Sequence, residues 1–203
     1  GIFQLDEEGN LNGKIQVADE GYDAMTRRTD YREKTASAFW KTTLQKIHPD
    51  ALVDSVTVEN PENPDQPLRA HLNCSIPAYA QVSGDFIYIN PVFYSSYNTN
   101  PFKLEHRIFP VDIPFPLKER IVLDLRIPPG YKVESLPEPA RLSLPNNGGR
   151  FQYMVKHDGD KVSLNSTFNV SQLHFESDEY DVLRSFFGMV AEKMGEQIVL
   201  KKI

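Results

Sequence analysis

Residues 151–170 have the sequence FQYMVKHDGDKVSLNSTFNV, and this stretch decides the fold class. From 162 to 170 apolar side chains alternate with polar ones, which is the two-residue period of a half-buried strand. Asp158-Gly159 is a hairpin turn signal, because Asp and Gly accept positive φ at low cost. The stretch therefore predicts an antiparallel hairpin that joins strands 151–155 and 162–170.

The same alternation recurs elsewhere in the chain. Residues 11–17 and 121–127 place apolar side chains at every second position, and most of 52–93 has strand-like composition. Short alternating strands joined by turn residues are typical of two packed antiparallel sheets. We therefore predict a mainly β fold, an antiparallel β-sandwich or a large supersandwich, with two covering α-helices.

The first of these helices is predicted over residues 30–47. Asp30 and Glu33 form a start that resembles a capping box, and apolar residues then recur at helical spacing. Pro49 ends this helix, because the residue before a proline avoids the α conformation. Residues 22–28, before the helix, are interpreted as a strand that pairs with residues 11–17.

The second helix is predicted from about Ser177 to Met194, with Gly195 as its C-terminal cap and a last strand at 197–201. No repeat or low-complexity tract divides the chain. The sequence favours one domain over residues 1–203. The alternative is a first β region with a helix over 1–100, followed by a C-terminal domain over 101–203, because the composition changes at the proline-rich and aromatic stretch near residue 100.

The composition excludes some partners. The 203 residues carry a formal net charge of −6, whereas a nucleic-acid binder needs a basic surface to displace counterions from phosphates. The sequence contains no run of about 20 apolar residues that could cross a bilayer. We therefore expect neither a nucleic-acid partner nor membrane insertion.

The search for catalytic groups begins with Cys74, the only cysteine. His71 lies three positions before it, and residues i and i+3 of a strand point to opposite faces, so these two side chains do not form a dyad. The favoured interpretation is a buried structural thiol. An enzyme would instead need a site assembled from distant residues, such as Cys74 with His106, and remains the third hypothesis.

Cofactor and metal motifs are also missing. None of the five histidines has the spacing of a zinc site, and no glycine-rich phosphate loop occurs. We therefore expect no cofactor, no metal and no catalytic residue in this chain.

An aromatic loop near residues 93–102 is the one candidate ligand site. Its rings and amides are of the types that stack on and hydrogen-bond to a sugar or a peptide. The alternative is a loop that packs its rings onto its own sheet, because aromatic side chains bury large areas wherever they can. The candidate ligand-binding residues are Phe93, Tyr94, Tyr97 and Asn98.

The C-terminal half of the chain carries an ordered set of motifs. Residues 100–112 (NPFKLEHRIFPVD), residues 127–137 (IPPGYKVESLP) and the ending at 179–202 resemble a bacterial family of domains of unknown function. Within these motifs we interpret the recurring residues as structural, with Arg107 predicted to pair with Asp112 as a bidentate donor. These residues are Arg107, Pro110, Asp112, Gly130, Tyr131 and Tyr180.

The resemblance implies a context for the chain. In that family the domain lies C-terminal to a transglutaminase-like core in multidomain proteins that look like exported envelope proteins. The catalytic Cys, His and Asp would belong to that core, before residue 1, and none of their motifs occurs here. Gly1 in place of an initiator Met, with no export signal after it, fits a piece of a longer protein.

The leading expectation is therefore a non-catalytic accessory domain. It would pack on or assist an upstream transglutaminase-like or protease-like core of the same polypeptide, in the periplasm or otherwise exported. The alternative is a cell-envelope glycan- or peptide-binding module that uses the aromatic loop. The two differ in whether Tyr94 and Tyr97 stand exposed beside a groove or are buried.

Overall fold

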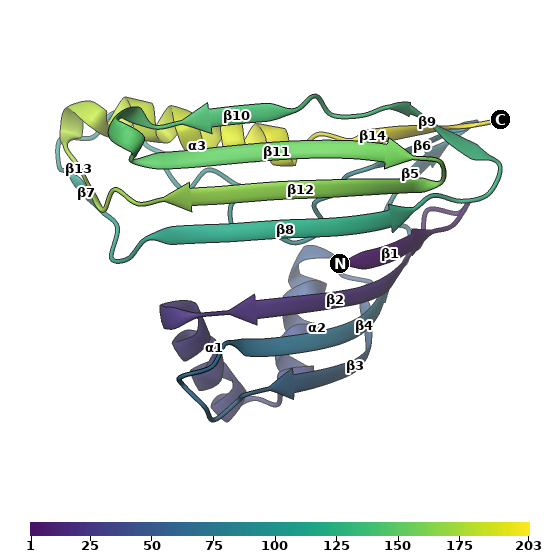
Figure 1. The fold of residues 1–203 in the computed structure, drawn as a ribbon, viewed down its shortest axis with the longest axis horizontal. Coiled ribbons are helices and arrows are strands. Elements are labelled where there is room, and N and C mark those ends of the chain that lie inside the picture. Colours follow the sequence, from purple (N-terminus) through teal and green to yellow (C-terminus); the bar gives the residue numbers. More distant parts are fainter. The chain divides into compact units, whose positions relative to one another are not determined.

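The computed structural model describes all residues, 1–203, and its architecture is mainly β with antiparallel sheets, as predicted (Figure 1). The chain divides into two compact units. The N-terminal unit comprises Gly1–Ile87 and Asp124–Pro129, and the C-terminal unit comprises Tyr88–Leu123 and Gly130–Ile203. The single domain and the alternative boundary near residue 100 both stay predictions, because compactness does not measure cooperative unfolding.

The N-terminal unit is a sheet with two helices. Its strands follow the order β1-β2-β4-β3 with antiparallel pairing, and the last residues of β8 (Leu117–Arg126) pair with β1 in parallel. The chain then enters the second unit through β6 (Phe86–Ile89). The other elements of this unit are β1 (Ile2–Leu5), β2 (Leu11–Asp19), α1 (Gly21–Glu33), α2 (Ala36–Ile47), β3 (Leu52–Glu59), β4 (Leu68–Ile76) and β5 (Gln81–Ser83).

The central pair β2–β4 has an unbroken register from Leu11 opposite Ile76 to Asp19 opposite Leu68. Every second residue of β4 is buried, so the alternation in the sequence separates a core face from a solvent face. Gly13 lets β1 approach closely, because a Cβ atom there would lie 2.2 Å from the carbonyl oxygen of Ile2.

The helical prediction for this unit is wrong in two respects. Residues 22–28, predicted as a strand, belong to α1, and the single helix predicted over 30–47 is divided between the end of α1 at Glu33 and α2 from Ala36 onward. The chain therefore has three α-helices instead of two. The break arises because Lys34 is extended and Thr35 caps α2, its side chain accepting a hydrogen bond from the N–H of Ala38 at 3.2 Å.

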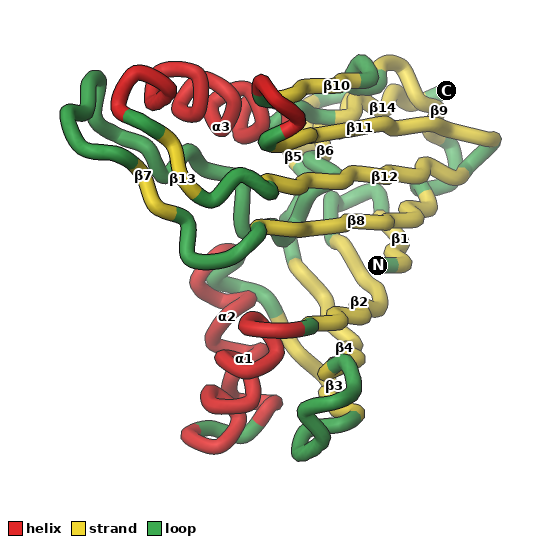
Figure 2. Tube along the Cα trace, turned by 60° about the vertical axis from the view of Figure 1, so that its left-hand side comes forward, coloured by secondary structure: helices red, strands yellow, loops and turns green.

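In the C-terminal unit the strands β10, β11, β12 and β8 are hydrogen-bonded neighbours in that order, and β9 pairs with β14. A two-stranded ladder, β7–β13, lies outside these sheets. Figure 2 shows α3 beside β10. The elements are β7 (Val111–Asp112), β9 (Tyr131–Ser135), β10 (Ala140–Ser143), η1 (Pro145–Asn147), β11 (Gly149–Asp158), β12 (Lys161–Val170), β13 (His174–Phe175), η2 (Ser177–Glu179), α3 (Tyr180–Met194) and β14 (Ile198–Lys202).

The predicted hairpin is confirmed. β11 and β12 pair in register from Gly149 opposite Val170 to Asp158 opposite Lys161, and Gly159 in the turn has φ +57°. The second predicted helix is also confirmed as α3, which buries Phe186 and Phe187 against Phe168 of β12. None of the three helices is both long enough and apolar enough to cross a membrane.

Candidate functional site

The aromatic loop that the sequence singled out follows β6 and folds onto its own unit. The Phe93 side chain is buried, and the ring of Tyr97 stacks on that of Phe168 with centroids 4.0 Å apart. Tyr94 is half-buried, whereas Asn98 is exposed. At least two of the four predicted ligand residues thus use their rings for packing. Ligand binding by this loop stays a prediction.

A carboxylate from β8 anchors this loop. The hydroxyl of Ser95 donates a hydrogen bond to Oε2 of Glu119 at 2.6 Å, and the backbone N–H of Ser96 donates to Oε1 at 2.8 Å. Burial raises the pKa of the Glu119 carboxyl above its ordinary value, against the effect of these hydrogen bonds. Glu119 was not predicted from the sequence, because its partners lie 23 and 24 residues away and no local spacing connects them.

The raised pKa of Glu119 predicts a pH dependence of stability. Because the folded chain binds this proton more tightly than the unfolded chain does, its contribution to the unfolding free energy increases as pH falls through the raised pKa. The gain is complete below the ordinary value of 4.5. Urea unfolding measures the unfolding free energy of the wild type minus that of a Glu119→Gln variant, which cannot titrate, and this value should rise as the pH falls from neutral to 4.5. A value that falls or stays constant on acidification would contradict the assignment.

A loop with three exposed apolar side chains follows the aromatic loop. We call residues 104–109 the apolar loop, because Leu104, Ile108 and Phe109 are exposed by 61%, 82% and 69%. Large apolar side chains exposed together on a loop are typical of an interaction surface. Their exposure makes this loop the candidate functional site.

The apolar loop is held in place by hydrogen bonds to its backbone and its flanks. Tyr180 Oη donates to the carbonyl of Leu104 at 2.8 Å, and Nδ2 of Asn100 donates to the carbonyl of Arg184 at 2.9 Å. Both bonds reach α3, an element from the far end of the chain. A loop fixed in this way loses little conformational freedom when it binds a partner.

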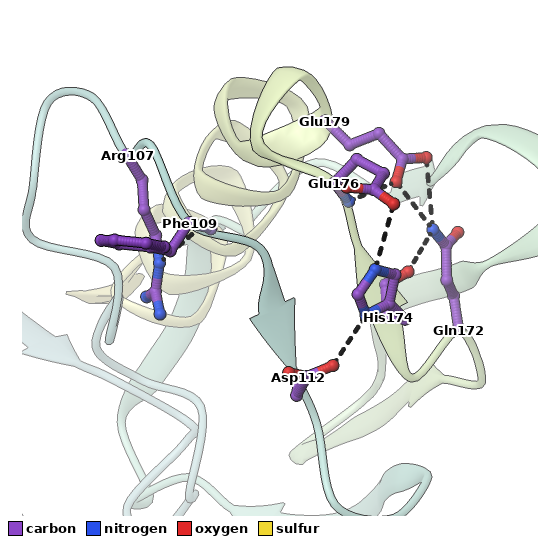
Figure 3. A network of polar contacts seen from close by, with 7 residues as sticks. All are labelled: Arg107, Phe109, Asp112, Gln172, His174, Glu176 and Glu179. Atoms are coloured by element: carbon purple, nitrogen blue, oxygen red, sulfur yellow. Dashed lines mark hydrogen bonds and ion pairs between the residues drawn. The ribbon is translucent and has the colours of Figure 1, made fainter.

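The predicted pair of Arg107 with Asp112 is wrong. Nε of Arg107 donates to the carbonyl of Phe109 at 3.1 Å, within its own loop, and Asp112 instead contacts His174 (Figure 3). The register of β7 and β13 explains this choice, because it places Asp112 directly opposite His174.

His174 connects a carboxylate of β7 with one that precedes η2 and α3. Its Nδ1 lies 2.7 Å from Oδ1 of Asp112 and its Nε2 lies 3.2 Å from Oε1 of Glu176, so the imidazolium can donate to both (Figure 3). Glu176 and Glu179 form a reciprocal capping box. The network therefore fixes a helix start, and the chain has no group of three or more His, Cys, Asp and Glu side chains arranged to hold a metal ion.

The two carboxylates raise the pKa of His174 above its ordinary value of 6.5, mainly through the hydrogen bonds to Asp112 and Glu176. A titration followed by NMR should show this raised pKa, and Asp112→Asn and Glu176→Gln should each lower it. The contact stabilises the folded chain below the ordinary pKa and is lost as pH rises through the raised one. An unchanged pKa in both variants would contradict the network.

The remaining motif residues have positions that suit a structural role. Gly130 has φ +81° and leads into β9, where Tyr131 is buried. Tyr180 is buried at the start of α3, while Pro110 connects the apolar loop to β7. The motif therefore marks turns and anchors around α3 and β9.

Cys74 has the surroundings of a structural thiol. Its side chain is 3% exposed on the core face of β4, and burial, with a smaller contribution from Asp54, raises its pKa to about 11. His71 points to the other face, as predicted, and its Nε2 lies 3.0 Å from Oε1 of Glu59. A thiol that stays protonated at neutral pH is a poor nucleophile.

No curated protein matches the chain. A crystal structure described as a putative protease from Parabacteroides distasonis ATCC 8503 has a TM-score of 0.48 and 13% identity, covering 60% of this chain and 24% of that one. The model of the family DUF3858, a domain of unknown function for which a structure has been solved, matches residues 85–200. Because this match spans more than half of the chain, the protein belongs to the DUF3858 family.

Proposed function

We propose that this protein is a non-catalytic accessory domain that packs on an upstream transglutaminase-like core of the same polypeptide. The motif resemblance supports both the accessory role and the choice of partner, and the match to the DUF3858 family supports the part of the resemblance that concerns residues 85–200. The same resemblance supports an exported, periplasmic setting. Cell fractionation with an antibody against the chain tests the setting, and recovery from the cytoplasm alone would contradict it.

The observation that carries the proposal is the exposed apolar loop. Phe109 and Ile108 stand in solvent with 69% and 82% exposure, while the carbonyl of Leu104 and the side chain of the flanking Asn100 are hydrogen-bonded to α3. A few large anchor residues contribute most of the affinity of a typical protein interface. A preorganised loop that presents an aromatic and an aliphatic side chain together suits such an anchor.

A binding titration tests the proposed role. The chain is added to the separately expressed transglutaminase-like region of the parent polypeptide, and the heat of binding is measured at several temperatures. We expect saturable binding with a negative heat-capacity change, because apolar surface becomes buried. The double variant Ile108→Ser/Phe109→Ser should bind at least about 10-fold more weakly, which corresponds to about 1.4 kcal/mol.

Met154→Ser is the matched control, because Met154 is also an exposed apolar residue of the C-terminal unit, on β11. It should bind the core as the wild type does. Equal binding by the double variant and the wild type would assign the contact to another surface. Catalytic turnover by the chain alone would overturn the non-catalytic role.

A further inference from the structure

A groove lies between α3 and the edge strand β10, within the C-terminal unit. Its volume is about 450 Å³, and Figures 1 and 2 show the helix running beside this strand. The groove is separate from the apolar loop, because no residue of 104–109 lines it. The lining residues used below are Arg141, Ser143, Asp181, Val182, Phe186 and Met189.

The strand side of the groove offers unpaired backbone groups. β10 is an edge strand of its sheet and pairs only with β11. The N–H of Leu144 donates to the carbonyl of Gly149 at 2.9 Å, which sets the alternation of hydrogen bonding along β10. Arg141 and Ser143 therefore direct their N–H and C=O groups away from β11, toward the open edge.

No proline or bulge interrupts the edge within β10, although the strand is short and carries Arg141. Its four residues are paired without interruption on the β11 side. Pro139 and Pro145 flank the strand on both sides. Because proline has no N–H to donate, these two residues limit an added strand to the length of β10.

The helix side of the groove offers apolar contacts. Val182 and Met189 of α3 are 47% and 45% exposed, although both are large apolar residues. They lie two helical turns apart on the same face of α3. The buried ring of Phe186 lies between them along the groove. Apolar side chains placed along the groove would cover Val182 and Met189.

Two charges of opposite sign define the polarity of the groove. The exposed side chains of Arg141 and Asp181 both line it, and they form no ion pair with each other. The Arg141 guanidinium can therefore take a carboxylate from a ligand in a bidentate contact.

We propose that this groove binds an extended peptide segment, which adds as a strand to β10. The backbone of the peptide pairs with the open groups of Arg141 and Ser143. Its apolar side chains cover Val182 and Met189, and an acidic side chain pairs with Arg141. Strand addition gives affinity through backbone hydrogen bonds and specificity through the alternating side chains. This site goes beyond docking on a catalytic core and uses none of the residues of the apolar loop.

The test uses a fluorescent ten-residue peptide of alternating valine and glutamate, titrated into the full chain and followed by anisotropy. We expect saturable binding in the micromolar range. Methylation of alternate backbone nitrogens of the peptide, in the register that faces β10, should weaken binding about 10-fold or more, because it removes the donors. Replacing glutamate by lysine in the peptide should also weaken binding. No binding up to about 1 mM peptide would overturn the proposal.

Variants of the chain test whether the peptide binds in the groove. Met189→Glu should weaken binding of the acidic peptide, and Arg141→Glu should reverse the preference between the glutamate and lysine peptides. Ser143→Ala is the control and should bind as the wild type does, since it keeps the backbone groups. Ile108→Ser/Phe109→Ser should leave peptide binding unchanged, so this proposal and the docking role fail separately. Equal affinity for the methylated and unmethylated peptides would overturn strand addition even if a variant did not fold.

Discussion

A Phe187→Ala variant is expected to lose about 3–5 kcal/mol of unfolding free energy, the range found when large core aromatics are truncated. Phe187 is 2% exposed on α3 and stands at the centre of a cluster of rings from three segments of the chain. Its ring centroid lies 5.0 Å from that of Phe102, 5.4 Å from that of Phe168 and 6.3 Å from that of Tyr97.

Urea unfolding followed by circular dichroism measures this loss. Val182→Ala is the control on the same helix, because Val182 is 47% exposed and its truncation leaves no buried cavity. The control should change the unfolding free energy by about 0.5 kcal/mol or less. A loss below about 1 kcal/mol for Phe187→Ala would show that the ring cluster contributes little to stability.

A Trp40→Ala variant is expected to destabilise the N-terminal unit by a similar amount, about 3–5 kcal/mol. Trp40 is 1% exposed on α2, and its Nε1 donates to the hydroxyl of Tyr31 at 2.7 Å. The guanidinium of Arg27 lies 4.9 Å from the indole ring and also pairs with Asp19 of β2. Truncation therefore removes a packed ring, the donor of the hydrogen bond to Tyr31 and the contact with the Arg27 guanidinium.

Far-UV circular dichroism must follow this variant, because Trp40 is the only tryptophan and its fluorescence is lost. Tyr31→Phe is the matched control. It keeps the ring and removes only the hydroxyl that accepts the indole N–H, so it should cost about 0.5–1.5 kcal/mol. Similar losses for the two variants would mean that the hydrogen bond, and not the buried indole, accounts for the effect.

The Phe187→Ala variant also tests the single-domain prediction. Trp40 fluorescence reports on the N-terminal unit, whereas Phe187→Ala weakens the C-terminal unit. If the chain unfolds as one domain, Phe187→Ala shifts the fluorescence and circular dichroism midpoints together. A fluorescence midpoint unchanged by Phe187→Ala would show that the units unfold separately.

Local patterns in the sequence were sufficient to predict the elements that bury one face. The β11–β12 hairpin and α3 were predicted because each buries one face, so the apolar spacing matches the geometry. α1 was missed because Ala24 is its only buried residue, and its sequence has no apolar stripe. Long-range contacts hold it: Nη2 of Arg28 donates to the carbonyls of Asn63 and Gln66 at 2.7 and 2.8 Å.

The candidate site was less predictable, because its contacts also join residues that are far apart in the sequence. The aromatic residues of the loop were recognised by type, but only the fold shows that Tyr97 stacks on Phe168, 71 positions later in the chain. The exposure of Ile108 and Phe109 was not predicted, because hydrophobic residues are usually buried. Exposure depends on tertiary neighbours, which a single sequence does not specify.

The pairing of β8 with β1 limits which segment of this chain can be transferred to another protein. The family region, residues 85–200, includes Asp124–Arg126, whose partner strand β1 begins 83 positions before that region, at Ile2. The region also ends before Lys201 and Lys202, which pair with β9. A fragment cut at those limits would carry an orphaned sheet edge and a shortened last strand, with the aggregation risk of unpaired edges. A transferred segment must therefore include β1 and the last residues of β14 together with the family region.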